Sequence, residues 1–181
     1  MKRIGEFKIR QATKLDNEAI RKVILAAYKD VAYSNKREHI MVERLRNSDA
    51  IVPELSLVAE DDNNDIVGHI LLTRIRIQNH DNSFEGLALA PLSIIPEFQN
   101  MGIGGKLIIE SHAKAKLLGY KYIVVLGHPD YYPRFGYERA STYGIQMPVK
   151  VNDANSMIIS LVEKGLSDVS GLVEFSTEFF E

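Results

Sequence analysis

The sequence contains no cysteine, and this absence excludes several kinds of chemistry at once. The chain can form no disulfide bond, can provide no thiol nucleophile and can hold no metal through cysteine. Histidine does not compensate, because no two of the five histidines have a spacing typical of metal ligands. We therefore expect a protein that works without a metal.

Long apolar runs and a dominant charge are also missing. No apolar stretch approaches the roughly 20 residues of a membrane span, and the first eleven residues, MKRIGEFKIRQ, are rich in charge. Lys and Arg number 22 against 24 Asp and Glu, so the net charge of -2 gives no basic field for nucleic acid or for an anionic membrane. These features favour a cytoplasmic protein that binds neither partner.

Nothing in the sequence indicates a boundary between two domains. There is no internal repeat, no low-complexity segment and no linker, and 181 residues with 45% hydrophobic content suffice for one well-buried core. We therefore expect a single domain over residues 1–181, of which 148–181 complete the sheet and wall the acceptor site.

The pattern of apolar and polar residues predicts an α/β fold with a mixed sheet, beginning in the order βααβββαβ. The expected strands are residues 7–12, 55–61, 66–78, 85–95, 121–126, 143–147 and 172–175. The expected helices are one that is capped by Asp16 and reaches Val31, then residues 36–47, 106–118 and 153–164, the last ended by Gly165.

Three glycines stand within four positions in the segment PEFQNMGIGGKL, residues 96–107. They lie between a predicted buried strand and a predicted amphipathic helix, hence on a strand-to-helix turn. The first amides of a helix have no intrahelical acceptor and the helix dipole adds positive charge there, which suits an anion. With Gly102, Gly104 and Gly105 removing side-chain bulk, a pyrophosphate could lie on the amides of residues 101–106. A tight turn that binds nothing is the alternative.

Two common phosphate loops do not fit this segment. A Walker A loop requires Gly at position 100 and Ser or Thr at position 107, whereas the chain has Asn100 and Leu107. The dinucleotide fingerprint counted from Gly102 also requires a glycine at position 107. Neither nucleotide-binding fold is supported.

The segment instead matches the pattern Gln/Arg-x-x-Gly-x-Gly/Ala from Gln99 to Gly104, and it resembles the coenzyme A loop of the GNAT superfamily of N-acetyltransferases. A second segment, YIVVLGHPDYYPRFGYER at residues 122–139, resembles the family's next strand, short helix and aromatic-Gly-aromatic ending. Two motifs in the right order are more specific than either alone. Their details are most similar to bacterial acetyltransferases of the YhbS type, and the likeness covers residues 7–147.

The resemblance implies the GNAT acyl-CoA N-acyltransferase fold, a mostly antiparallel twisted sheet with splayed middle strands, flanked by helices. It implies acetyl-CoA as co-substrate and direct transfer of the acetyl group to a primary amine of a small molecule or a protein, without a cysteinyl intermediate. The amide of Ile94 would bind the developing oxyanion. The residues assigned to the coenzyme are Leu92, Ser93, Ile94, Gln99, Asn100, Met101, Gly102, Ile103, Gly104, Gly105 and Lys106.

Two residues are assigned to proton transfer by the same resemblance. Tyr132 occupies the family's position for the general acid that protonates the leaving thiolate, and its neighbour Tyr131 is the alternative hydroxyl. Glu85, at the start of the strand before the glycine loop, is the expected general base, with Ser93 and His128 as alternatives.

Other interpretations stay open. A non-catalytic module could keep the acetyl-CoA site and lose turnover, and a structural α/β domain would leave the glycine turn empty. The acceptor is not identified, because the segments that form the acceptor site in this family share no common code; Tyr28, Tyr33, Glu43 and Asp49 are available there. A homodimer also stays open.

Overall fold

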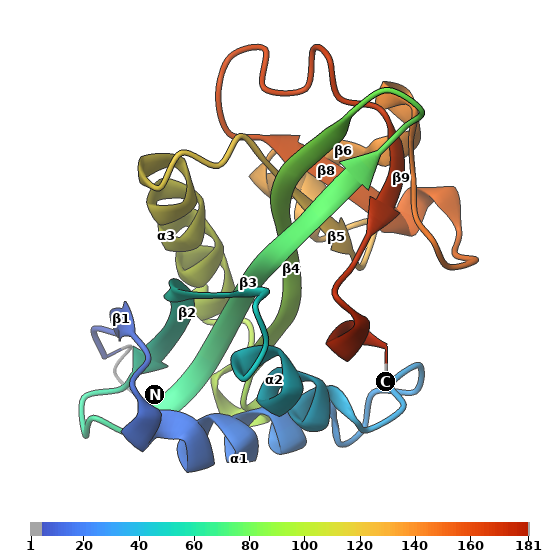
Figure 1. Ribbon diagram of the computed structural model, residues 1–181. Helices are drawn as coiled ribbons and strands as arrows, with labels where there is room; N and C mark the ends of the chain where they lie inside the picture. The colour runs from blue at the N-terminus through green and yellow to red at the C-terminus, as the bar shows by residue number, and fades with distance from the viewer. Residues whose placement is uncertain (1–4, 181) are drawn as a thin grey trace.

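The computed structural model describes residues 5–180, so that residues 1–4 and 181 of the predicted domain lie outside the described part. One nine-stranded sheet runs through the described chain in the order β1-β2-β3-β4-β5-β8-β6, and β9 pairs with both β3 and β7 (Figure 1). The strands are β1 (Lys8–Gln11), β2 (Ile51–Glu60), β3 (Ile66–Gln78), β4 (Ser83–Ile94), β5 (Tyr122–Leu126), β6 (Glu138–Arg139), β7 (Ile145–Gln146), β8 (Ser156–Ser160) and β9 (Gly171–Glu174). The α-helices are α1 (Asn17–Tyr28), α2 (Glu38–Arg46) and α3 (Ile103–Leu117).

Helices cover both faces of the sheet. On one face, α1 and α2 bury Ile24 and Leu45 against Leu71 of β3. On the other face, α3 buries Leu107 in a core that includes Ile70 of the same strand. Alternate residues of β3 thus face opposite layers, as the two-residue period of a strand requires. The predicted α/β fold is confirmed, with a mostly antiparallel sheet and a parallel pair at its centre.

The central strands β4 and β5 separate after two paired positions. Their last described pair is Ala88 with Val124, although β4 runs on to Ile94 and β5 to Leu126. The backbone groups beyond this pair have no neighbouring strand on that side. The predicted splaying of the middle strands is therefore confirmed.

A bulge in β4 accompanies this separation. Ile70 and Leu72 of β3 pair with Leu92 and Leu89, so that β4 has one more residue than β3 over the same stretch. Pro91 lies inside this stretch, where its missing N–H removes no ladder hydrogen bond. The bulge turns the end of β4 away from its parallel neighbour.

The helix predicted for residues 153–164 is wrong. Ser156–Ser160 form β8, which pairs with β5 on one side and with β6 on the other. Met157 is buried in the core beneath α3, and Ile158 is buried in the core of the opposite face. A short apolar run buried on both faces fits helix and strand periodicity equally, and here pairing with β5 decides. Gly165 ends a turn, with its amide donating to the carbonyl of Val162.

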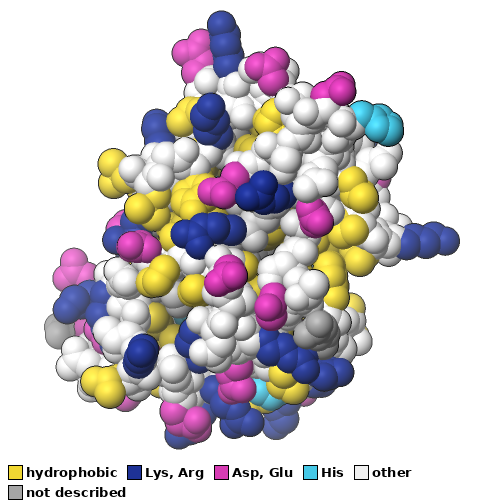
Figure 2. Space-filling view, in the orientation of Figure 1, with side chains coloured by type: hydrophobic (Ala, Val, Ile, Leu, Met, Phe, Trp, Pro, Cys, Tyr) yellow, Lys and Arg dark blue, Asp and Glu magenta, His cyan; other side chains and the backbone are white. Residues whose placement is uncertain are grey.

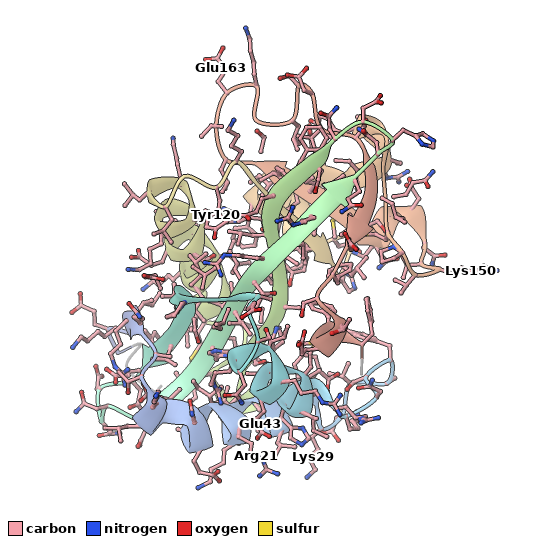
Figure 3. The ribbon with its side chains drawn as sticks, viewed as in Figure 1. Arg21, Lys29, Glu43, Tyr120, Lys150 and Glu163 are labelled. Atoms are coloured by element: carbon pink, nitrogen blue, oxygen red, sulfur yellow. The ribbon has the colours of Figure 1, made fainter. Side chains whose placement is uncertain are left out.

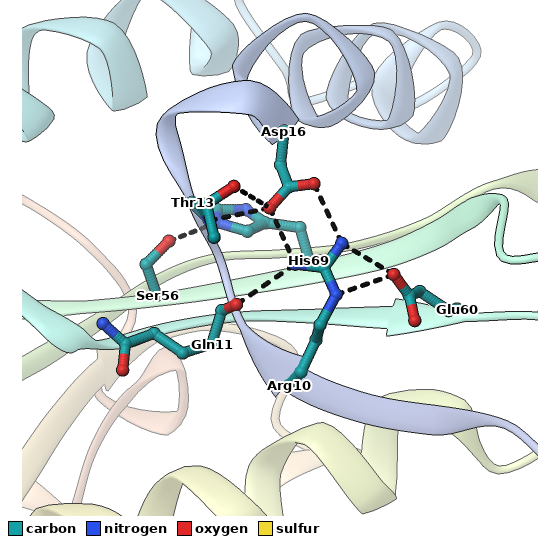
Figure 4. A network of polar contacts seen from close by, with 7 residues as sticks. All are labelled: Arg10, Gln11, Thr13, Asp16, Ser56, Glu60 and His69. Carbon is teal, nitrogen blue, oxygen red and sulfur yellow. Dashed lines mark hydrogen bonds and ion pairs between the residues drawn. The ribbon is translucent and has the colours of Figure 1, made fainter.

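Asp16 precedes α1, as predicted, but its carboxylate does not cap that helix. It accepts hydrogen bonds from the amide of Thr13 at 2.7 Å and from the guanidinium of Arg10 at 2.7 and 2.9 Å (Figure 4). Arg10 also pairs with Glu60 of β2 at 2.6 Å. The hydrogen bond from Arg10 holds the pKa of Asp16 well below its usual range. This network fastens β1 and the start of α1 to β2.

Asp16→Asn should lower the free energy of unfolding by about 1–2 kcal/mol near neutral pH, because it removes the charge that faces Arg10. The pKa of Asp16 is lower in the folded than in the unfolded chain, so its charge stabilises the fold above about pH 4 and the contribution fades as the pH falls further. Urea unfolding at several pH values should show the gap between wild type and variant closing in acid.

The matched control for this change is Asp153→Asn. Asp153 pairs with Arg139 at 3.3 Å, and both side chains are more than half exposed. Such a pair contributes little, so this variant should stay within about 0.5 kcal/mol of wild type. A loss at Asp16 that does not depend on pH would contradict the electrostatic explanation.

Candidate active site

The gap between β4 and β5 holds a cavity of about 160 Å³. Residues 88–92 of β4 and 124–126 of β5 form its sides, and Tyr28 of α1 and Tyr132 close it from two directions. A second cavity of about 830 Å³ lies against it, and both tyrosines line this cavity as well. The separated strands therefore border a narrow inner cavity that continues into a wider outer one.

The backbone of β4 beyond the bulge presents alternate residues to the gap. The amide of Ile95 donates to the carbonyl of Val67 on β3 at 3.0 Å. In an antiparallel pair, Ser93 then also turns its backbone toward β3, whereas Leu92 and Ile94 turn theirs away. The amides of Leu92 and Ile94 therefore face the gap, and the amide of Ser93 does not.

The carbonyl groups of the same two residues support this orientation. Tyr28 donates its hydroxyl to the carbonyl of Leu92 at 3.2 Å, and the side-chain amide of Gln99 donates to the carbonyl of Ile94 at 2.9 Å. Both donors come from outside the sheet. Gln99 thus ties the glycine loop to the end of β4.

Helix α3 begins at Ile103, three residues before the predicted start, so Gly104 and Gly105 lie in its first turn. Gly102 precedes it in the left-handed conformation with φ of 82°, which glycine adopts without strain. The first helical bond runs from the amide of Lys106 to the carbonyl of Gly102 at 3.1 Å. The amide of Lys106, which the sequence assigned to the pyrophosphate, is therefore engaged, and the amides of residues 103–105 have no intrahelical acceptor.

The aromatic segment after β5 packs directly onto this turn. A Cβ atom at Gly104 would lie 2.6 Å from the hydroxyl oxygen of Tyr131. The Tyr131 ring contacts Phe135 with 5.3 Å between centroids, and the Arg134 guanidinium lies 4.5 Å from the ring centroid. The Tyr131 hydroxyl therefore lies against the start of α3, and Tyr131 does not line the inner cavity.

Tyr132 takes a different position. Its ring packs edge-on against Tyr131 and Tyr137, with centroid distances of 5.2 and 5.5 Å. Within the described chain no group forms a hydrogen bond with its hydroxyl, and the residue lines both cavities. Burial raises the pKa of Tyr132, so the phenol keeps its proton near neutral pH.

Comparison with known proteins matches the part of the chain that forms this site. The acetyltransferase (GNAT) domain model matches residues 53–139, which include the glycine loop and Tyr132. The crystal structure of a GNAT family acetyltransferase from Brucella melitensis, in complex with acetyl-CoA, is 31% identical and has a TM-score of 0.79, covering 97% of this chain and 99% of that one. The chain belongs to the GNAT family of N-acetyltransferases.

Two Escherichia coli proteins agree with this membership. The uncharacterized N-acetyltransferase YjhQ is 40% identical over 107 residues, and the match spans 59% of this chain and 59% of YjhQ. YhbS is 27% identical over 82% of this chain and 86% of its own length. The crystal structure of YhbS in complex with CoA has a TM-score of 0.88 and covers 98% of this chain and 93% of that one. The predicted likeness to the YhbS type is confirmed.

The position of Glu85 does not favour its predicted role of general base. Glu85 is exposed at the start of β4, opposite Arg76 of β3; it lies three residues before Ala88, about 10 Å from where the gap begins at some 3.3 Å per residue, and lines neither cavity. A general base must come within hydrogen-bonding reach of the amine. The separation of β4 from β5 and the inner cavity lie toward the other end of this strand.

The two alternative bases differ in position. Ser93 is 1% exposed, lies opposite His69 across β3 and lines neither cavity. His128 is exposed at the outer cavity, 4.0 Å from Asp130. His69 is fully buried, and burial lowers its pKa to about 3, so it stays neutral beside Ser56. Of these residues, only His128 lines a cavity.

The four candidate acceptor residues lie in different places, and two of them line the outer cavity. Tyr28 and Tyr33 line the outer cavity. Glu43 instead faces Arg21 between α1 and α2, with 3.4 Å between the charged groups (Figure 3), and Asp49 uses its carbonyl to accept from Arg74. Glu43 and Asp49 thus serve contacts outside the two cavities.

Two residues of the site were missed by the sequence analysis. Gly127 follows β5, and a Cβ atom there would lie 2.3 Å from the ring of Tyr132, so only glycine lets that ring lie as it does. Its place in the motif LGHPDYY was the available signal. Glu38, the first residue of α2, lines the inner cavity, and nothing in its local sequence distinguishes it.

Across residues 5–180, no three acidic or histidine side chains approach closely enough to hold a metal ion. Within the same range, no helix combines the length and apolarity that a membrane span needs. Figure 2 shows acidic and basic side chains interspersed on the face it presents, in line with the small net charge.

Proposed function

We propose that the protein transfers the acetyl group of acetyl-CoA directly to a primary amine. The observation that carries this proposal is the unpaired end of β4, which directs the amides of Leu92 and Ile94 into the gap beside β5, where Leu92 and Tyr132 line the inner cavity. The crystallised relatives that hold CoA or acetyl-CoA support it.

The donor would bind through backbone groups on the α3 side of the sheet. Its pyrophosphate would lie on the amides of residues 103–105, where the start of α3 adds positive charge, with Lys106 as an exposed cation beside it. Asn100, Met101 and Gly102 would shape the turn, in which Asn100 and Gly102 both have positive φ. The pantetheine arm would follow β4 and pair with Leu92 and Ile94.

Transfer would proceed in the gap between β4 and β5, beside the inner cavity, without an enzyme-bound acyl group. The nitrogen lone pair of the neutral amine attacks the thioester carbon, and the amide of Ile94 stabilises the oxyanion that forms. As the carbon–sulfur bond breaks, Tyr132 gives its proton to the thiolate, and the amine nitrogen releases a proton that restores the phenol. The free hydroxyl of Tyr132 at this cavity supports the assignment.

A non-catalytic acetyl-CoA-binding module remains the second candidate. The unpaired hydroxyl of Tyr132 favours the enzyme, because a tyrosine that served packing alone would gain stability by satisfying its hydroxyl. A cytoplasmic location, a single domain over residues 1–181 and the absence of a metal stay predictions from the sequence.

Thiol release from acetyl-CoA in the presence of a panel of primary amines tests this function. We expect release that depends on the amine, together with acetyl-CoA binding measured by calorimetry in the same preparation. Binding without amine-dependent release would favour the non-catalytic module. Absence of binding would contradict both candidates.

A further inference from the structure

The inner cavity has an unusual composition for a site that must receive an amine. Its walls are apolar or aromatic, and they include Met41 of α2 and Phe175 and Phe179 of the C-terminal segment. Among the described residues that line it, Glu38 alone carries a carboxylate. A single negative group therefore faces an otherwise apolar space.

Glu38 stands where the inner cavity meets another opening. A third cavity of about 310 Å³ is lined by Tyr33, Asn35, Arg37, Phe180 and Glu38, and it shares Glu38, Met41 and Phe179 with the inner cavity, which Arg37 does not line. Its lining residues come from α2, the segment before it and the C-terminal segment. Figure 1 shows that α2 and the C-terminal segment lie away from α3. An acceptor that entered here would pass Glu38 before it reached the gap between β4 and β5.

The Glu38 side chain is held in place but its charge is not neutralised. It is half-buried at the start of α2 and accepts a hydrogen bond from the hydroxyl of Ser34. The ammonium of Lys36 fixes the loop before it by donating to the carbonyls of Tyr28 and Val31 at 2.7 and 2.6 Å. In the described chain, no Lys, Arg or His forms an ion pair with Glu38.

A carboxylate that is positioned and unpaired in an aromatic cavity suits a cation. Aromatic faces also attract cations, and removal of water strengthens both interactions. Arg37 lines the third cavity but not the inner one, so within the inner cavity Glu38 would repel an amine that carries a second negative group. The inner cavity, at about 160 Å³, leaves little room for a bulky acceptor. The geometry thus selects a compact amine with an apolar body.

We propose that Glu38 binds the ammonium group of a small, apolar primary amine that lacks a carboxylate, and so determines the acceptor class. This rests on the acetyltransferase function proposed above. Glu38 acts before the chemical step, by concentrating the cationic acceptor beside Tyr28 and Phe179. The ammonium then gives one proton to bulk solvent, and the neutral nitrogen attacks the thioester once it has moved into the gap.

The test compares Glu38→Gln with Glu43→Gln, a matched change on the same helix at a residue that faces Arg21. With 2-phenylethylamine as acceptor, Glu38→Gln should raise KM by about 10- to 100-fold, the range expected for loss of a charge-assisted hydrogen bond, and change kcat far less. Glu43→Gln should leave both constants near wild type. With 2,2,2-trifluoroethylamine, which is largely neutral at the assay pH, KM should change little in either variant.

A second measurement separates this proposal from the acetyltransferase function. Calorimetry of 2-phenylethylamine with CoA-loaded protein should show binding that weakens in Glu38→Gln, whether or not turnover occurs, while acetyl-CoA affinity stays unchanged. Equal KM and equal amine affinity in wild type and Glu38→Gln would overturn the role of Glu38. Preference for phenylalanine, spermidine or a peptide N-terminus over 2-phenylethylamine would overturn the acceptor class even where acetyl transfer is demonstrated.

Discussion

Gly104→Val should reduce acetyl-CoA affinity by about 100-fold or more and leave the fold intact. A Cβ atom at this position would lie 2.6 Å from the Tyr131 hydroxyl and 3.6 Å from Leu92, so the valine side chain fills the space directly over the free amides of α3. Charge-assisted hydrogen bonds from such amides are worth about 1.5–3 kcal/mol each, and loss of one or two accounts for the expected change. Isothermal calorimetry with acetyl-CoA and a thermal melt of the same sample measure both quantities.

Gly119→Ala is the control for effects of stability alone. Gly119 follows the other end of α3 at φ of 90°, with no atom within 4 Å of its would-be Cβ, so alanine there strains the backbone far from the loop. We expect a lower melting temperature and unchanged acetyl-CoA affinity for this variant. If folded Gly104→Val bound acetyl-CoA as tightly as the wild type, the pyrophosphate could not bind at this turn.

The strand-to-helix turn at the glycine loop and the short helix that begins at Tyr132 could be predicted from sequence because both depend on local features. A strand end, left-handed positions and a helix start follow one another within about ten residues, and the chemistry of free amides needs nothing else. The order of strands and helices up to β5 was also correct, because each of these elements has a clear apolar period.

The sequence analysis could not reveal features that the three-dimensional arrangement decides. Glu85 is on β4, but the bulge and the separation from β5 lie toward that strand's other end. Glu38 lines the inner cavity from α2, across the sheet from the glycine loop. The residues next to Glu38 in the sequence give no sign that its side chain lies there. β8 became a strand through pairing with β5, which its own periodicity could not reveal.

The same limit applies to the backbone assignments along β4. The sequence named Leu92, Ser93 and Ile94 together, yet the alternation of an antiparallel pair divides them. The sequence shows that the strand is there, but only its register with β3 shows which amides face the gap. The structure therefore narrows the proposed contacts to Leu92 and Ile94.

Tyr132→Phe should lower turnover by about 10²- to 10⁴-fold, the usual contribution of a general acid. The change keeps the ring, and with it the edge-on contacts to Tyr131 and Tyr137, and removes only the hydroxyl. Because that hydroxyl has no hydrogen-bond partner in the described chain, its removal should scarcely change the melting temperature or the acetyl-CoA affinity. Steady-state rates with an accepted amine, compared at equal coenzyme saturation, measure the loss.

Tyr131→Phe is the matched control, since the two tyrosines are adjacent and their rings touch. The Tyr131 hydroxyl lies over Gly104, outside the inner cavity, so its removal should affect coenzyme affinity more than turnover. If Tyr132 is the general acid, Tyr132→Phe lowers kcat and leaves coenzyme affinity nearly unchanged, whereas Tyr131→Phe lowers coenzyme affinity more than kcat. If Tyr131→Phe instead loses more turnover than Tyr132→Phe, the proton comes from the hydroxyl at the glycine loop, and the thiolate must leave closer to α3 than the inner cavity implies.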